Sequence, residues 1–495
     1  SVVLSDTGVT MGHNRLAIID LSLASSQPMK SPDGRFMLTY NGELYNFREL
    51  KEEIGDRYQF KTEGDTEVVL AAYMVWGHEC VLKFNGMFAF AVWDRDREEL
   101  FLARDHAGIK PLYYFWDGEQ FIFSSEVKGI LEGGVDRAID MEAASMYFRL
   151  SYVPEPYTMF AQIKSLPAGS LATLSKGLFS IERYFSLLDA PEETLLARDA
   201  AHELDELLDR AVSRQLVSDR PVGVFLSGGL DSSAVLSAAA KVHPGIDTFT
   251  VRFSLPESNE EEKFNEDAEL AREVAAQFGA HHHEITITPE EVPALLLKAA
   301  FHMDVPVSNP TIPSMLRLSE ETAKTATVVL NGDGGDELFG GYTRYRFSKR
   351  VLLYQKLVPA IARALLAKVR PIFAKANLPP GIGLFAQFMF QKDATLASVL
   401  SPELVTNNAF DRYRDRYFSE RGDFLRQFMS ADREGWLVDE ALMRTDRTTM
   451  AAALEARVPL LDRELLAFAA RVPTKLKPRL RITKILPRIA FRNSL

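Results

Sequence analysis

The spacing of apolar and polar positions changes along the chain and predicts parts of different architecture. Residues 1–126 hold two helical stretches, at 47–54 and 66–76, among short apolar and aromatic runs separated by Gly, Asp, Asn and Pro. The predicted strands are 15–21, 36–40, 87–93, 100–103, 112–115 and 121–124. This order predicts sheets with helices packed outside them, an α+β or sandwich-like domain.

Residues 221–331 instead alternate strand-like runs with helical patterns. The apolar runs 222–226, 248–253 and 326–330 are separated by segments of helical periodicity, of which 264–278 is the clearest. Such alternation predicts a doubly wound parallel sheet, which binds ligands beyond the carboxyl ends of its strands. Beyond residue 342 the chain becomes helical, with 352–357, 361–369 and 439–456 as the clearest helices.

A polar connector at 186–198 separates these parts, so the sequence predicts one domain over 1–185 and a second over 199–495. The chain opens on Ser1 without an initiator methionine, and no capped element closes it at Leu495. We therefore expect residues to be missing at both ends.

Composition narrows the class of protein. Apolar residues make up 46% and charged residues 25% of the 495 residues, as in ordinary globular proteins. The net charge of −11 argues against broad binding to nucleic acid or to an anionic membrane, and no run of 18 apolar residues predicts a membrane span. The single cysteine, Cys80, suits a reducing cytoplasm.

The segment 225–233, FLSGGLDSS, is the clearest candidate site. Its apolar run ends at a pair of glycines, Gly228 and Gly229, and a helical pattern follows. Glycines let the backbone approach an anion, and the helix N-terminus adds its positive dipole end. Serine hydroxyls can donate to phosphate, and Asp231 can hold Mg²⁺. The loop lacks the lysine of a Walker loop and resembles the PP-loop of ATP pyrophosphatases.

A second loop, NGDGGDE at 331–337, follows the apolar run that ends at 330. It places Asp333, Asp336 and Glu337 among glycines, and a buried acidic turn is costly without a cation. We predict that Asp231 and Asp336 share Mg²⁺ from neighbouring strand ends. A solvated Asp/Gly turn is the alternative interpretation of this loop alone.

Several polar clusters of the first part jointly resemble the glutaminase domain of class II glutamine amidotransferases. They are GHNRL at 12–16, IIDL at 18–21, QPM at 27–29, NGELYN at 41–46, GDTE at 64–67, FNGMFAF at 84–90 and RDHAGIKPLYY at 104–114. The resemblance implies that Arg15 holds the glutamine carboxylate and that Glu43 and Asp65 hold its amino group. It also implies an oxyanion hole formed by Asn41 and the amide of Gly42.

The nucleophile of that family is a cysteine at the mature N-terminus, whose own amine serves as base. Cys80 lies in a helical stretch and is better interpreted as a small buried apolar residue. A chain that starts at Ser1 is therefore not expected to hydrolyse glutamine by the family's mechanism. A Met-Cys-Gly start upstream would restore that function.

Nearly the whole chain resembles glutamine-dependent asparagine synthetases. The specific motifs are SGGLDSS at 227–233, GDGGDELFGGY at 332–342, LEARVPLLD at 454–462 and TK-x-x-x-R at 483–488. The resemblance implies an αββα glutaminase sandwich followed by an α/β ATP pyrophosphatase domain. It implies an ATP site formed by Leu226, Ser227, Gly228, Gly229, Asp231, Ser232, Val251, Gly332 and Lys484. By the same resemblance Asp231 and Asp336 bind Mg²⁺, and Lys484 stabilises charge on the α-phosphate.

The implied reaction amidates aspartate to asparagine. The side-chain carboxylate attacks the α-phosphate of ATP and releases pyrophosphate; ammonia, normally from glutamine, then attacks the aspartyl-adenylate and releases AMP. Two departures weaken the assignment of aspartate. The family commonly has Glu where Asp333 stands close to the reacting carboxyl, and Asp-Glu-Pro where this chain has DVP at 304–306 followed by SNP at 308–310.

Other functions stay open at this point. Relatives that amidate sugars or close lactam rings share the scaffold, so the acceptor is another carboxylate in one alternative. A tRNA-modifying PP-loop adenylase would need a basic surface, which the net charge does not supply. A nucleotide-binding scaffold without glutaminase activity also stays open, because the nucleophile is not visible. The oligomeric state, a homodimer included, is left undetermined.

Overall fold

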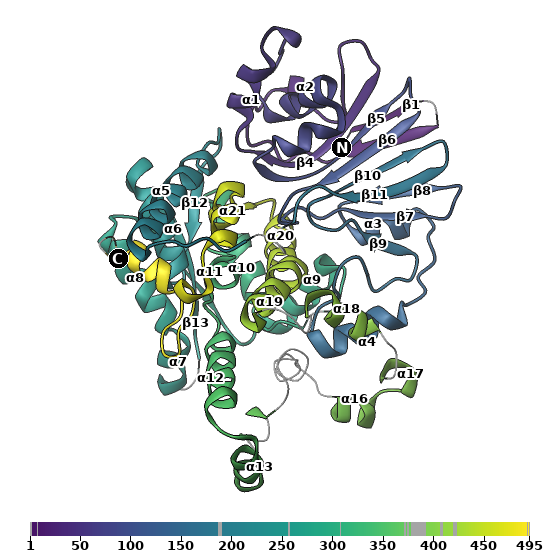
Figure 1. Ribbon diagram of the computed structural model, residues 1–495. Coiled ribbons are helices and arrows are strands. Elements are labelled where there is room, and N and C mark those ends of the chain that lie inside the picture. The colour runs from purple at the N-terminus through teal and green to yellow at the C-terminus, as the bar shows by residue number, and fades with distance from the viewer. Residues whose placement is uncertain are drawn as a thin grey trace.

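We analysed a computed structural model of the chain. It describes residues 2–6, 8–186, 191–255, 258–306, 308–370, 373, 376–377, 393–405, 409–418, 423–492 and 494. The N-terminal sheets lie above and beside a second body that carries a parallel sheet and most of the helices (Figure 1). Part of the predicted connector, residues 187–190, lies outside the described residues.

The N-terminal part is built on a six-stranded antiparallel sheet of order β11-β10-β6-β5-β4-β3. Its strands are β3 (Met29–Lys30), β4 (Phe36–Leu44), β5 (Gly86–Asp94), β6 (Glu99–Arg104), β10 (Ser170–Ser175) and β11 (Leu178–Arg183). A three-stranded sheet places β7 (Tyr113–Trp116) between β8 (Phe121–Ser124) and β9 (Ile163–Ser165). A separate hairpin pairs β1 (Val2–Asp6) with β2 (Val9–His13).

Three apolar clusters define the layers of this part. Alternate strand residues such as Leu38 and Phe90 pack under α1 (Phe47–Ile54) and α2 (Asp65–Trp76), while the opposite face packs against the smaller sheet. The far side of that sheet packs against α3 (Val127–Glu132) through Val127 and Ile130. The predicted αββα order is therefore confirmed.

The strand predicted at 15–21 is wrong, because the structure has an irregular loop there. The Arg15 guanidinium donates hydrogen bonds to the carbonyl oxygens of Ile19, Asp20 and Ser22. A positive φ of 53° at Asp20 also turns the chain. Arg15 thus holds the loop through these hydrogen bonds, and Ile18 and Ile19 are buried without strand pairing.

The second part contains a five-stranded sheet of order β14-β13-β12-β15-β16, with every pair parallel. Its strands are β12 (Val222–Phe225), β13 (Asp247–Phe253), β14 (His281–Ile287), β15 (Val328–Leu330) and β16 (Glu455–Arg457). The predicted doubly wound sheet is confirmed. Strand order reverses between β12 and β15, which creates a topological switch point at their carboxyl ends.

The chain leaves the predicted helix 439–456 early. A π-helix, η4 (Asp432–Leu442), continues into α20 (Met443–Met450), and a turn with φ of 54° at Ala453 leads into β16. The sequence favours helix here because the segment is rich in alanine and leucine. Pairing with β15 overrides that local preference. β16 is three residues long and all three are buried, so its conformation is set by the neighbouring strand.

The remaining elements surround these sheets. The helices are α4 (Met141–Leu150), α5 (Ala197–Gln215), α6 (Leu230–Val242), α7 (Ser258–Phe264), α8 (Glu266–Gln277), α9 (Val292–Met303), α10 (Ile312–Thr322), α11 (Gly335–Phe339), α12 (Thr343–Leu357), α13 (Ala360–Val369), α16 (Asp393–Val399), α17 (Pro402–Val405), α18 (Ala409–Tyr417), α19 (Phe424–Ala431), α21 (Arg463–Arg471) and α22 (Ile485–Ala490). Short 3₁₀ turns are η1 (Leu23–Ser25), η2 (Gly55–Arg57), η3 (Gly77–Leu82), η5 (Pro459–Leu461) and η6 (Thr474–Leu476). The predicted helical C-terminal part is confirmed.

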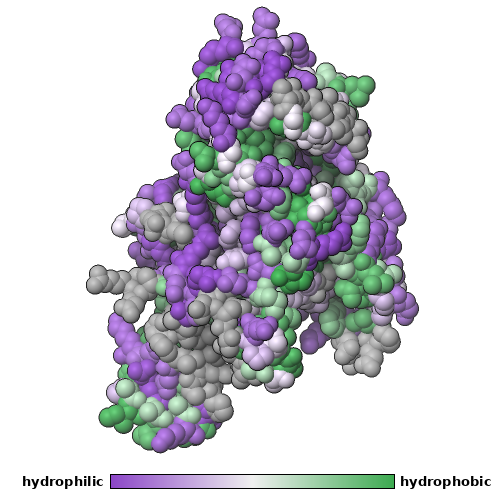
Figure 2. Space-filling view, turned by 90° about the vertical axis from the view of Figure 1, so that its right-hand side faces the viewer, coloured by the Kyte–Doolittle hydropathy of each residue, from purple (hydrophilic) through white to green (hydrophobic). Residues whose placement is uncertain are grey.

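The face shown in Figure 2 carries hydrophilic and apolar groups, and apolar groups lie also on its lower protrusion, where α13 exposes Ile361, Leu365 and Val369. Among the described residues, no helix combines the length and the hydrophobicity that a bilayer crossing requires.

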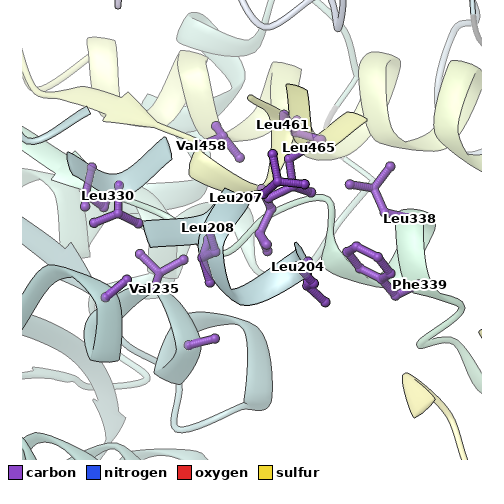
Figure 3. Close-up of a cluster of buried hydrophobic side chains, with 14 of the residues drawn as sticks. Leu204, Leu207, Leu208, Val235, Leu330, Leu338, Phe339, Val458, Leu461 and Leu465 are labelled. Atoms are coloured by element: carbon purple, nitrogen blue, oxygen red, sulfur yellow. The ribbon is translucent and has the colours of Figure 1, made fainter. Parts of the chain in front are cut away.

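One apolar cluster holds the two parts together. Leu204, Leu207 and Leu208 of α5 point toward side chains of α6, β15, α11 and α21 (Figure 3). The same cluster includes Tyr45 and Met87 of the N-terminal part. The interface between the parts is therefore continuous with a core rather than a loose contact.

We expect the Leu208→Ala variant to lower the free energy of unfolding by about 2–5 kcal/mol, because it leaves a cavity in this core. Urea denaturation followed by circular dichroism measures the change. The matched control is Leu297→Ala on α9, where the side chain is 77% exposed and the expected change is within about 0.5 kcal/mol. Equal effects of the two substitutions would contradict the assigned core.

Candidate functional site

The glycine pair of the PP-loop-like segment lies between β12 and α6, at the switch point of the parallel sheet. Gly228 has a φ of +70°, and a Cβ there would stand 2.6 Å from the backbone nitrogen of Ala271. The hydroxyl of Ser232 lies 3.0 Å from that of Ser227, whose oxygen accepts a hydrogen bond from the Gly229 amide. Only glycine fits this close packing, which shapes a tight anion-accepting turn.

The second loop, 331–337, packs directly on the first. A Cβ at Gly332 would stand 2.8 Å from the Ser232 nitrogen, and one at Gly335 would stand 2.2 Å from Oδ2 of Asp231. The glycines therefore allow the loop after β15 to lie against the loop after β12. The two loops that the sequence predicted as neighbours are brought together.

Lys484 joins these loops from near the end of the chain. It precedes α22 with a φ of 50°, and its Nζ lies 2.6 Å from Oδ2 of Asp231 and 2.7 Å from Oδ1 of Asp336. A Cβ at Gly341 would stand 2.3 Å from Cε of Lys484, so this glycine makes room for the lysine. Spacing alone did not single out Lys484; its assignment came from the family resemblance.

The pKa values of Asp231 and Lys484 are shifted from their ordinary values. Burial raises the pKa of Asp231 to about 6, although the positive charge of Lys484 opposes that shift. Burial lowers the pKa of Lys484, but the carboxylates of Asp231 and Asp336 outweigh it and raise the pKa above its usual value. Lys484 therefore carries its positive charge at neutral pH, where Asp231 is mostly ionised.

The donor set fits Mg²⁺ that arrives with a polyphosphate. Mg²⁺ is commonly bound by one or two carboxylates together with substrate phosphates and waters. Asp231 and Asp336 supply two such carboxylates, and the described residues contain no cluster of three or more His, Cys, Asp or Glu that would form a metal site unaided. A phosphate-borne ion matches these residues better than a permanently held one.

Asp333 points to different partners from Asp231 and Asp336. Its Oδ2 accepts hydrogen bonds from Asn331, at 2.8 Å, and from the hydroxyl of Thr445 on α20, at 2.7 Å. Burial raises its pKa, while the positive charge of Arg444 opposes the shift. Asp333 thus lines the α20 side of the loop, beside the lysine cluster.

More polar side chains lie near Asp333 on the α20 side of the second loop. Glu440 accepts from Arg444 at 3.0 Å and from the side-chain amide of Asn309 at 2.7 Å. Sequence reasoning noticed the unusual SNP segment that contains Asn309 but missed Arg444, Thr445 and Glu440. Their helical spacing gave no sign that tertiary packing would turn them toward the second loop.

The remaining predicted nucleotide contacts lie close to this edge. Leu226 follows β12, and its amide donates to the carbonyl oxygen of Phe249 at 2.9 Å. Val251 lies two residues further along β13 and packs among the apolar residues of the sheet. The Leu226 amide is therefore already used within the fold.

An open cavity in the N-terminal part collects the predicted glutamine residues. Its lining includes Arg15, Asn41 and Gly42, together with the buried carboxylates of Glu43 and Asp65. A Cβ at Gly42 would stand 2.1 Å from the carbonyl oxygen of Met87, so close strand packing requires glycine there. Met450 and Glu455 of the second part also line the cavity, a contribution that sequence reasoning missed.

The two carboxylates in this cavity lie in a strongly desolvated environment. Burial raises the pKa of Asp65 to about 6, although hydrogen bonds from the Leu44 amide and the Tyr40 hydroxyl oppose the shift. Burial and the nearby Asp65 raise the pKa of Glu43 as well. Buried carboxylates without enough counter-charge favour a cationic ligand group such as an ammonium.

Cys80 lies elsewhere, within η3, and is fully buried. Burial raises the pKa of its thiol above the usual range, which disfavours the reactive thiolate. The interpretation of Cys80 as a small buried residue is confirmed.

Comparison with known families agrees with this two-part arrangement. The family model described as asparagine synthase matches residues 203–495, and the model described as a glutamine amidotransferase domain matches residues 1–185. The chain belongs to the asparagine synthetase family. It is 35% identical to asparagine synthetase [glutamine-hydrolyzing] 1 of Bacillus subtilis, over 98% of this chain and 77% of that protein.

Two further relatives support this membership. A putative asparagine synthetase [glutamine-hydrolyzing] of Mycobacterium tuberculosis is 34% identical over 99% of this chain and 77% of its own length. Asparagine synthetase B [glutamine-hydrolyzing] of Escherichia coli is 32% identical over 81% of this chain and 69% of its own length.

The raised pKa of Asp231 predicts a pH-dependent affinity for MgATP. With a pKa of about 6, the ionised fraction of Asp231 falls about fourfold between pH 7.5 and 5.5, so the apparent Kd should rise by about that factor. Calorimetric titration at each pH measures it. Asp231→Asn is the reference variant. Its Kd for MgATP still changes with pH through all the other titrating groups, those of ATP included, but not through residue 231. Parallel profiles of the two proteins would contradict a role for the Asp231 charge.

Proposed function

We propose that this protein amidates aspartate to asparagine at the expense of ATP, through an aspartyl-adenylate, with release of AMP and pyrophosphate. The observation that carries this proposal is the position of Lys484 between Asp231 and Asp336, at the switch point where two glycine loops meet. Membership of the asparagine synthetase family supports the same reaction.

In the proposed mechanism, the loop 227–232 binds the β- and γ-phosphates through its amides and hydroxyls. Backbone at Leu226, Val251 and Gly332 contacts the nucleotide. Lys484 stabilises the charge that develops on the α-phosphate as the aspartate carboxylate attacks it.

Mg²⁺, held by Asp231 and Asp336 with the phosphates, would neutralise the departing pyrophosphate. When ATP binds, its phosphates replace the carboxylates as partners of Lys484. The existing ion pairs keep the lysine charged and oriented until then.

The acceptor side of the site is proposed to be the network around Asp333. Asp333, Thr445, Arg444 and Glu440 lie on the α20 side of the second loop and present both charge signs there. Such a surface can orient a substrate that bears an ammonium and two carboxylates, as aspartate does. Asn309 extends the network through Glu440. The product assay also tests the alternative that the acceptor is a different carboxylate.

We further propose that residues 1–185 form a glutaminase domain, joined by 186–198 to a synthetase domain at 199–495. Arg15 would bind the glutamine carboxylate, Glu43 and Asp65 its ammonium, and Asn41 with the Gly42 amide its oxyanion. Arg15 already donates to three loop carbonyls, so this role requires some of those hydrogen bonds to be exchanged. Glutamine hydrolysis would also need a nucleophile other than Cys80.

The single buried cysteine also supports a reducing compartment, and we place the protein in the cytoplasm. Analytical ultracentrifugation tests whether the protein forms a homodimer.

The assay that tests this function supplies MgATP, aspartate and ammonium chloride and measures AMP, pyrophosphate and asparagine together. Equal amounts of the three products are expected. Pyrophosphate without asparagine would contradict aspartate as the acceptor, and a folded protein that binds ATP but releases no pyrophosphate would contradict the ligase.

In the same assay, Asp231→Ala and Lys484→Met should each lower the rate at least about 100-fold, because each removes a charge that contacts the reacting phosphates. Lys324→Met is the matched control, since that side chain is 68% exposed and pairs with Glu321. Near-normal activity of Lys484→Met would contradict its proposed role.

A further inference from the structure

Arg457 ends β16 of the second part, and its side chain contacts Glu43 and Glu455, two residues that line the cavity assigned to glutamine. The side chain is fully buried, with Nε donating to Oε1 of Glu455 at 2.8 Å. Its Nη1 donates to the carbonyl oxygens of Gln215 and Val217, at 2.8 and 2.7 Å, just beyond α5. Its Nη2 lies 3.0 Å from Oε2 of Glu43 on β4. Hydrogen bonds from Nε and Nη1 thus hold the guanidinium, and Nη2 adds an ion-pair contact with Glu43.

Glu43 is held by this contact through one oxygen only. Its other oxygen, Oε1, is buried and has no hydrogen-bond partner in the described part of the chain. A buried carboxylate oxygen without a partner is costly unless a ligand satisfies it. Because Glu43 lines the cavity, an ammonium that binds there can supply the charge partner that this carboxylate lacks.

The charges around the cavity support the same conclusion. Glu43, Asp65 and Glu455 contribute three buried carboxyl groups, and Arg457 is the cation that contacts two of them. Burial and the neighbouring Asp65 raise the pKa of Glu43, and the positive charge of Arg457 opposes that shift and so favours the ionised carboxylate. A protonated Glu43 cannot form an ion pair with an ammonium.

Arg457 also contacts the opposite site through its backbone. Its carbonyl oxygen accepts from the Asn331 amide at 2.8 Å, and the Asn331 side chain donates to Asp333. One three-residue strand therefore lies between the two proposed sites.

We propose that Arg457, a residue of the synthetase part, is a positioning residue for glutamine: its ion pair holds the Glu43 carboxylate in place for the ammonium of bound glutamine. The inference rests on the proposed glutaminase function of the cavity. It makes glutamine binding depend on the docking of β16 against β4, so the glutamine cavity is complete only when both parts of the chain are assembled.

The test measures the Kd of L-glutamine by calorimetry and, separately, the ammonia-dependent rate of asparagine synthesis. Arg457→Gln is expected to raise the Kd at least about tenfold, while the ammonia-dependent rate falls by less than about threefold. Arg457→Lys keeps a charge but lacks the guanidinium fork, so its Kd should lie between those of the unaltered protein and Arg457→Gln.

A double-mutant cycle separates positioning from general damage. In a Glu43→Gln background, Arg457→Gln should raise the Kd by less than about threefold, because the carboxylate that it positions is already gone. Arg463→Gln is the matched control. Arg463 also reaches from the second part to the first, donating to the carbonyl oxygen of Phe84 at 3.1 Å, but it does not line the cavity and should leave the Kd unchanged.

Additive effects in the cycle, or a loss of ammonia-dependent synthesis as large as the loss of glutamine affinity, would overturn the positioning role. If Arg457→Gln does not fold, the cycle is run with Arg457→Lys under the same criteria. Failure of the unaltered protein to bind glutamine would overturn the assignment of the cavity and this proposal together. Ammonia-dependent synthesis would then still report separately on the ligase.

Discussion

The contact of Lys484 with Asp231 and Asp336 is the interaction on which the proposed chemistry depends. Three charged groups from three distant segments share a largely desolvated position, at 2.6 and 2.7 Å. Such an arrangement is expensive to bury and is stabilised only by close mutual pairing. Gly335 and Gly341 make the approach possible, since a side chain at either position would overlap this group. The fold thus maintains a charged cluster poised for a polyphosphate.

The second constraint is the shared interface between the parts. The α5 leucines pack against α21 and α11, and the same apolar cluster extends to Tyr45 and Met87. Within the interface, Asn85 donates to Asp462 at 3.0 Å, and Lys110 pairs with Asp446 at 2.9 Å. Buried polar pairs of this kind fix the orientation of two surfaces more than they add stability.

Much of this architecture follows from local sequence. The helix at 47–54, the parallel strands and the two glycine loops were predicted because periodicity and Gly-rich turns are local properties. The strand β16 and the loop 15–21 were missed because each depends on distant partners: β15 for the strand, and the hydrogen bonds of Arg15 for the loop.

The site residues show the same division. Neighbouring glycines mark Asp231, Asp333 and Asp336 as site candidates in the sequence. Lys484 has no such local signal and was assigned through the family resemblance. Arg457 and Glu455 belong to a recognised motif, but their contact with Glu43 spans the whole interface and appears only in three dimensions. Long-range ion pairs of this kind cannot be obtained from spacing along one chain.

The most direct test of the proposed adenylation follows the oxygen atoms. Aspartate labelled with ¹⁸O in its side-chain carboxylate is incubated with the protein, MgATP and ammonium chloride, and the AMP and pyrophosphate are analysed by mass spectrometry. Attack of the carboxylate on the α-phosphate, beside Lys484, transfers one ¹⁸O to AMP and none to pyrophosphate. Asparagine formed with unlabelled AMP would contradict the adenylate and with it the central role of the Lys484 cluster.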